Sequence, residues 1–125
     1  MSICTDKNNE LFSRLGLHNI FRKLWEQHIM WTRSFIISTA ADLGDLAPVT
    51  RRLLRNPRDF GRVLQVFYCH DIVKRFVELF TEHLTNAAEL VNAAKAGNTA
   101  AADRLRDIWY KNAEEIARFL SMINP

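Results

Sequence analysis

The stretch Leu90-Val-Asn-Ala-Ala-Lys-Ala-Gly97-Asn-Thr-Ala100 decides the fold, because it ends one helix and begins another within a few residues. The alanines before Gly97 favour helix, and a glycine directly after such a run is typical of the position where a left-handed backbone closes a helix. Asn98 or Thr99 can then cap the next helix by accepting from its free amides. A turn this short makes the two helices antiparallel.

A second boundary of the same kind is expected at Gly44. This glycine follows a long apolar-periodic segment and precedes Asp45, a good N-cap residue, with Pro48 in the next first turn. The chain has only four glycines and three prolines in 125 residues, so long helices joined by short turns are the natural interpretation.

Apolar residues recur at helical spacing between these boundaries and predict four helices, over about 19–43, 47–68, 70–96 and 98–123. A short helical turn over 9–15 is expected before Gly16. A break or kink is expected at Asn56-Pro57, since proline lacks the amide donor. No stretch alternates as a strand does, and Glu26-Gln27-His28 and Glu82-His83 are too short to indicate a repeat. We expect an all-α, four-helix up-and-down antiparallel bundle over 19–125, after an N-terminal tail over 1–18.

Composition and charge exclude only a few classes of function. The 17 Lys and Arg against 14 Asp and Glu leave a formal charge of +3, which is weak support for a polyanionic partner. The basic cluster Arg51, Arg52, Arg55, Arg58 and Arg62 lacks interleaved aromatic residues, so a solvated helix face is expected and nucleic-acid binding is not. The start lacks a secretion signal, no apolar run reaches a membrane span, and two distant cysteines suit a reducing compartment, so we expect a soluble cytoplasmic protein.

Several polar residues interrupt the apolar stripes and need partners, because an unsatisfied buried polar group costs about 1–3 kcal/mol. His28 lies among Leu24, Trp25 and Trp31, and His83 among Leu79 and Phe80, so both rings are expected to point inward. Counted along antiparallel helices, one middle layer would also contain three more polar residues: Asn112, Glu115 and Asp59.

This layer leaves three interpretations open. His28, His83 and Glu115 could hold Zn²⁺ or Fe²⁺, since two imidazoles and a carboxylate leave a coordination position open. The same layer could form a small-ligand or catalytic pocket, with Asn112 and Asp59 as accessory contacts. It could also be a satisfied structural network that fixes the register of the helices. Ferritin-like spacing is absent, because Trp25 and Phe80 stand where that site needs glutamates.

The predicted first helix is apolar beyond one stripe. Ile29, Met30, Ile36 and Ile37 surround Arg33 and widen its apolar arc, which favours a homo-oligomer contact along this helix. A structural or interaction module that forms a homodimer is therefore the alternative to a metal-binding or ligand-binding bundle.

Longer segments resemble a family of short bacterial proteins. The similar segments are Leu24-Trp-Glu-Gln-His-Ile-Met-Trp-Thr-Arg-Ser-Phe-Ile-Ile-Ser38, Thr50-Arg-Arg-Leu-Leu-Arg-Asn-Pro57, Glu82-His-Leu84, Leu90-Val-Asn-Ala-Ala-Lys-Ala-Gly97 and Trp109-Tyr-Lys-Asn112. Members of this family carry the name acetylglutamate synthase or kinase, so the resemblance implies a link to N-acetylglutamate metabolism. It supplies no catalytic residues.

The family name implies chemistry for which this sequence lacks the usual parts. An amino-acid kinase needs Gly-rich phosphate loops in a larger α/β domain, and an acetyltransferase needs strands around its cofactor cleft. No phosphate loop, dinucleotide fingerprint or nucleophile elbow occurs here either. We therefore expect a non-enzyme, and keep an enzyme acting on an N-acyl amino acid, dependent on His83, as the weakest alternative.

Overall fold

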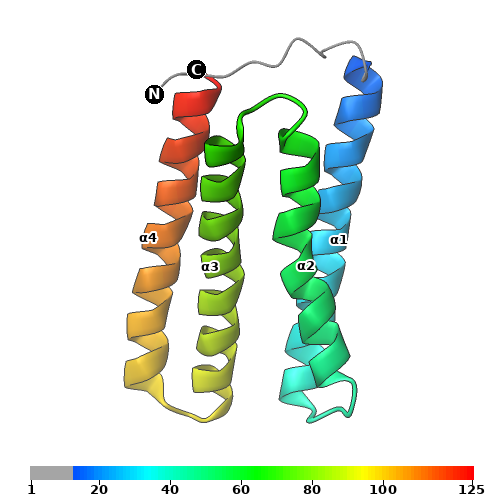
Figure 1. Ribbon diagram of the computed structural model, residues 1–125. Helices are drawn as coiled ribbons and strands as arrows, with labels where there is room; N and C mark the ends of the chain where they lie inside the picture. The colour runs from blue at the N-terminus through cyan, green and yellow to red at the C-terminus, as the bar shows by residue number, and fades with distance from the viewer. Residues whose placement is uncertain (1–12) are drawn as a thin grey trace.

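The computed structural model describes residues 13–125, which form four helices. These are α1 (Arg14–Ala40), α2 (Leu46–Leu64), α3 (His70–Lys95) and α4 (Thr99–Ile123). Consecutive helices run in opposite directions, as Figure 1 shows. The all-α, four-helix, up-and-down prediction is confirmed, and within residues 13–125 no helix has the length and apolar character needed to cross a bilayer.

The turn from α3 to α4 forms as its sequence predicts. Gly97 adopts a left-handed φ of 71°, and the Asn98 side chain caps α4 by accepting from the amide of Ala101 at 3.1 Å. At the turn from α1 to α2 the left-handed residue is Asp42, with a φ of 51°, and not Gly44. Aspartate tolerates this conformation better than most residues, so glycine is not required there.

The expected start of the first helix, near Asn19, is wrong. Helix α1 already begins at Arg14, where Ser13 caps it by accepting from the amide of Gly16 at 3.0 Å, so residues 14–18 belong to the bundle and Gly16 does not interrupt the helix. The remainder of the turn expected over 9–15 lies outside the described residues. Of the tail expected over 1–18, residues 1–12 also lie outside the described part of the chain.

Helix α2 ends at Leu64 instead of near Tyr68, so the expected end of this helix is wrong. It continues through Pro57, so of the break or kink expected there the break does not occur. Pro57 and its neighbours Asn56 and Phe60 are buried. A proline inside a helix costs about 3 kcal/mol, and the burial of Pro57 and its neighbours in the core offsets this cost.

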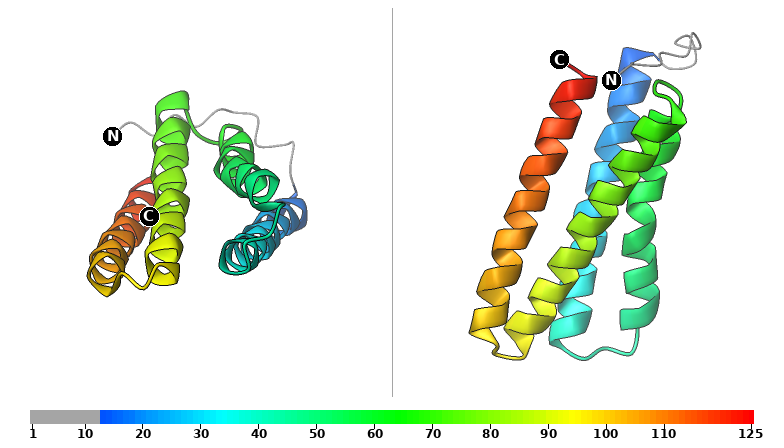
Figure 2. Two further views of the ribbon diagram at one scale, coloured as in Figure 1. Left: turned by 90° about the horizontal axis from the view of Figure 1, so that it is seen from below. Right: turned by 60° about the vertical axis from the view of Figure 1, so that its left-hand side comes forward.

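The four helices form two antiparallel pairs that are splayed apart. Helix α1 packs on α2, α4 packs on α3, and the pairs meet mainly where α2 packs on α3. Figure 2 shows this arrangement end on, with α1 and α4 at the two outer sides of the bundle. Along the described chain the backbones of α1 and α4 do not pack together, so one side of each outer helix lacks the cover of a closed bundle.

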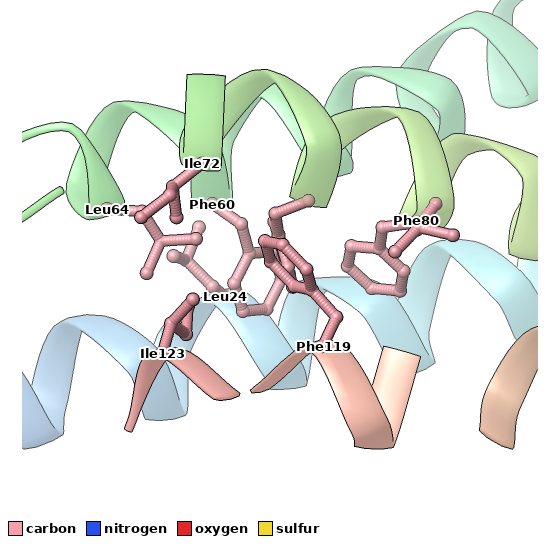
Figure 3. Close-up of a cluster of buried hydrophobic side chains, with 9 residues drawn as sticks. Leu24, Phe60, Leu64, Ile72, Phe80, Phe119 and Ile123 are labelled. Carbon is pink, nitrogen blue, oxygen red and sulfur yellow. The ribbon is translucent and has the colours of Figure 1, made fainter. Parts of the chain in front are cut away.

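The hydrophobic core has two parts. The larger cluster draws on all four helices and includes Leu24, Phe60, Phe80, Phe119 and Ile123, which Figure 3 labels. The second cluster contains Phe35, Val49, Leu53 and Leu84 from α1, α2 and α3. Helix α4 contributes to the first cluster alone, near its C-terminal end.

The crossing of α2 and α3 depends on a close approach at Gly61. A Cβ atom added at Gly61 would lie 2.7 Å from Cγ2 of Val77 and 3.4 Å from Cγ1 of Val73, and the first of these distances is shorter than side chains tolerate. A larger residue would therefore push apart the main contact between the two pairs.

We predict that Gly61→Ala lowers the free energy of unfolding by about 1–3 kcal/mol, because the added methyl overpacks the α2/α3 contact. Gly44→Ala is the matched control, since a Cβ there meets nothing within 4 Å and the φ is not left-handed. That control should be neutral or stabilising. Urea unfolding measures both, and equal effects of the two substitutions would contradict the prediction.

Candidate functional site

His28 is held by an asparagine of the neighbouring helix. Oδ1 of Asn56 lies 3.1 Å from Nδ1 of His28, and Nδ2 of Asn56 donates to the backbone carbonyl of Leu24 at 3.2 Å. Asn56 is completely buried. Its amide thus bridges a helical carbonyl and the imidazole one turn later on α1.

His83 is held in the same way on the second helix pair. Oδ1 of Asn112 lies 2.9 Å from Nδ1 of His83, and Nδ2 of Asn112 donates to the carbonyl of Leu79 at 3.1 Å. The carbonyl and the histidine are again four residues apart. We call each unit of carbonyl, asparagine and histidine a His–Asn clasp, the first on α1/α2 and the second on α3/α4.

The clasp fixes which ring nitrogen carries the proton. A backbone carbonyl only accepts, so the asparagine must direct its NH₂ group to it and its oxygen to the imidazole. Nδ1 of each histidine therefore donates to that oxygen, and in the neutral ring the lone pair is on Nε2. No described residue forms a hydrogen bond with Nε2 of His28 or His83, and neither ring is fully buried, so within residues 13–125 these two lone pairs have no partner.

The two helix pairs repeat each other around these clasps. His28 and His83 lie 55 positions apart, and the same offset relates the left-handed residues Asp42 and Gly97. It also relates the bonds that close the helices, from Leu43 N to Ser38 O and from Asn98 N to Ala93 O, both at 3.0 Å. The chain thus contains a structural repeat that sequence reasoning missed.

Aromatic rings connect the two clasps across the bundle. His28 stacks on Phe80 with ring centroids 5.1 Å apart, and Phe80 lies 6.3 Å from His83. His83 in turn stacks on Trp109 at 5.0 Å, and Trp25 packs edge-on against His28 at 5.5 Å. Both histidines are half-buried in this row, so each ring is fixed by an amide on one edge and by aromatic faces at its sides.

Burial keeps both imidazoles neutral near neutral pH. Desolvation lowers the pKa of His28 below 6.5; the hydrogen bond with Asn56 partly offsets this, and the charge of His83 lowers it further. Desolvation also lowers the pKa of His83, against a smaller raising effect of its bond with Asn112. Desolvation of the half-buried rings is thus the main cause of both shifts in pKa.

The carboxylates expected in this layer lie elsewhere. Glu115 is exposed and forms an ion pair with Arg75 of α3 at 3.5 Å, so its carboxylate is not part of the clasp. Asp59 is paired with three arginines of α2, namely Arg52 at 3.8 Å, Arg55 at 3.3 Å and Arg62 at 3.4 Å. Among residues 13–125 no group of three His, Cys, Asp or Glu side chains is placed to hold a metal, so the expected set of His28, His83 and Glu115 is not assembled.

The structure thus brings some of the predicted polar residues together in the clasps, and it adds one residue that was not predicted. His28, His83 and Asn112 belong to the clasps, Glu115 and Asp59 do not, and Asn56 is the functional candidate that sequence reasoning missed. A signal for it existed: Asn56 follows His28 by 28 residues, and Asn112 follows His83 by 29.

The basic cluster of α2 is partly neutralised. Asp59 takes three of its five arginines, and Arg52 also lies over the ring of Trp31, with its guanidinium carbon 5.2 Å from the ring centre. Arg51 and Arg58 are exposed. A helix face that pairs its own charges in this way offers little free charge for phosphates.

No family model, curated protein or solved structure matches this chain. The site must therefore be interpreted from its own geometry.

We predict that Asn56→Ala and Asn112→Ala each lower the free energy of unfolding by about 1–3 kcal/mol, because a helical carbonyl loses its second donor and an imidazole N–H loses its acceptor. Asn92→Ala is the matched control, since Asn92 is exposed on α3. Chemical denaturation compares the three variants. If both clasp variants behave like the control, the clasps do not stabilise the fold.

The lowered pKa values predict a pH dependence with a definite sign. The folded rings bind protons less readily than the unfolded chain, so the free energy of unfolding should decrease as the pH falls from about 6.5 through the folded pKa values, and these rings should have no effect above that range. Urea unfolding at about pH 7.5 and about pH 5.5 measures this decrease. It should shrink in His28→Gln/His83→Gln and persist in His18→Gln/His70→Gln, whose parent histidines are exposed. A decrease of equal size in both double variants would contradict this assignment.

Proposed function

We propose that this protein binds a small ligand through the Nε2 atoms of His28 and His83. The observation that carries the proposal is the duplicated clasp, which commits Nδ1 of each ring to an asparagine oxygen and leaves Nε2 as the available nitrogen. Histidines that bind metals are oriented by the same device, with the second ring nitrogen donating to an oxygen. A single clasp would be a structural detail, whereas two equivalent clasps present a pair of oriented lone pairs.

The ligand chemistry follows from what a neutral imidazole offers at Nε2. It donates an electron pair, so its partner is an N–H or O–H group of an organic molecule, or a transition-metal ion such as Zn²⁺ completed by water. The low pKa of both rings supports this role, because the lone pairs remain unprotonated at neutral pH. The neighbouring rings of Trp25, Phe80 and Trp109 favour a ligand with an apolar or flat part.

NMR of the histidine side chains tests the proposal with two kinds of probe. Zn²⁺ is titrated in one arm, and a set of small organic N–H and O–H donors in the other. We expect one arm to shift Nε2 of both His28 and His83, and the response to weaken at least about tenfold in His28→Gln and in His83→Gln. The exposed His18→Gln is the control. No response at either ring in both arms, or binding that survives both substitutions, would overturn the proposal.

A second candidate function is favoured by a separate observation on α1. Of the eleven exposed large apolar side chains in the described residues, six lie on α1 and none on α2 or α3. Monomers seldom concentrate exposed apolar surface in this way. An interaction module that associates through α1, with clasps that fix helix register, is therefore the alternative.

A further inference from the structure

Helix α1 is apolar on two faces. One face carries Leu24 and Phe35 into the core, while the outer face exposes Ile29, Met30, Ile36 and Ile37, with exposed fractions of 66%, 52%, 44% and 43%. A helix that is apolar on more than one side normally buries both sides. Within this chain nothing described covers the outer face, because α1 packs only on α2 and α3.

We propose that a second copy of the chain covers this face, with the two α1 helices packed antiparallel about a two-fold axis that passes between Ile29 and Met30. This inference rests on the second proposed function and specifies its partner. In such a contact every pairing of two residues across the interface occurs twice, because a two-fold interface uses the same surface on both copies.

The charges on the outer face select this arrangement. Arg33 is exposed within the apolar patch, and no described acidic residue forms an ion pair with it. Glu26 lies two turns earlier on the same side of α1, and its ion pair with Arg22 is highly exposed and therefore weak. An antiparallel contact centred between Ile29 and Met30 places Glu26 of each copy opposite Arg33 of the other.

Two alternative self-pairings of α1 place like charges together. A parallel contact aligns Arg33 with Arg33 of the second copy, and so does an antiparallel contact centred on Arg33. Like charges in contact are unfavourable, and opposite charges at matched positions fix both partner and register. The same helix thus carries the acid, the base and the apolar centre that a two-fold contact requires, which favours a second copy over an unrelated protein.

The shape of the face agrees with this partner. Ile29, Thr32, Ile36 and Ile37 line a shallow and mainly apolar depression that His28 and Arg33 border. An apolar side chain from the second copy can enter it. The depression also places the first clasp next to the proposed contact, so association would shield the ring of His28 from solvent.

Charge reversal tests the proposal without disturbing the core. The oligomeric state of the full chain is measured by sedimentation velocity over a concentration series. We expect the wild type to form a dimer. Glu26→Arg and Arg33→Glu should each raise the dissociation constant at least about tenfold, because each substitution creates a pair of like charges at both symmetry-related positions of the interface. The double variant Glu26→Arg/Arg33→Glu should restore the dimer, since the pairs re-form with their signs exchanged. Arg104→Glu, an equal charge change on α4, should have no effect, and circular dichroism checks that every variant is folded.

The outcomes separate this inference from the function on which it rests. A wild type that stays monomeric at all concentrations overturns both. A dimer that is disrupted by Ile29→Asp but unaffected by the single charge reversals overturns the register and keeps the interaction module. Single variants that dissociate and a double variant that fails to recover overturn the pairing of Glu26 with Arg33.

Discussion

The structure depends most on one small unit, an asparagine amide that spans a helical carbonyl and the imidazole one turn later. A carbonyl in a helix accepts one bond from the helix and has a second lone pair to offer, and Nδ2 of Asn56 or Asn112 takes it. Because the amide has only one acceptor, its oxygen is left for the histidine. One hydrogen bond between helices thereby determines a tautomer, and the rotation and height of two neighbouring helices are fixed together.

The same unit explains why the bundle can remain open. In a closed four-helix bundle each helix is held by two neighbours, whereas here each pair has its own buried polar contact and needs less from the other pair. The pairs are joined mainly by the α2/α3 contact at Gly61 and by the cluster around Phe60 and Phe80. The outer helices α1 and α4 keep one side without a helical neighbour, and on α1 that side is apolar.

How far the sequence predicts this molecule can be judged from particular residues. Gly97 and Asn98 act locally, since a left-handed turn and a side-chain cap are encoded within a few positions, and the four helices follow from such signals. The helix break expected at Pro57 does not occur, because the local preference of proline against helix is outweighed by tertiary burial, which no local sequence pattern contains. Asp42 in place of Gly44 is a similar case, because several residue types can occupy a left-handed position.

The sequence predicts the height of the site residues along the bundle, but not the direction in which each side chain points. Counting residues along antiparallel helices places His28, His83, Asn112 and Glu115 near one height, yet it does not tell which way each side chain turns. Glu115, three positions after Asn112, points instead to Arg75.

Asn56 was hidden for a related reason: next to a proline it is typical of a helix end, and its partner lies 28 residues earlier. A contact between two helices cannot be detected in the sequence pattern of either helix alone. When the contact occurs twice, the sequence contains two histidines and two asparagines at nearly equal separations, and this repeated spacing indicates two units of the same construction. For a chain built of repeated hairpins, comparison of one half with the other therefore carries information about contacts that periodicity within a single helix cannot supply.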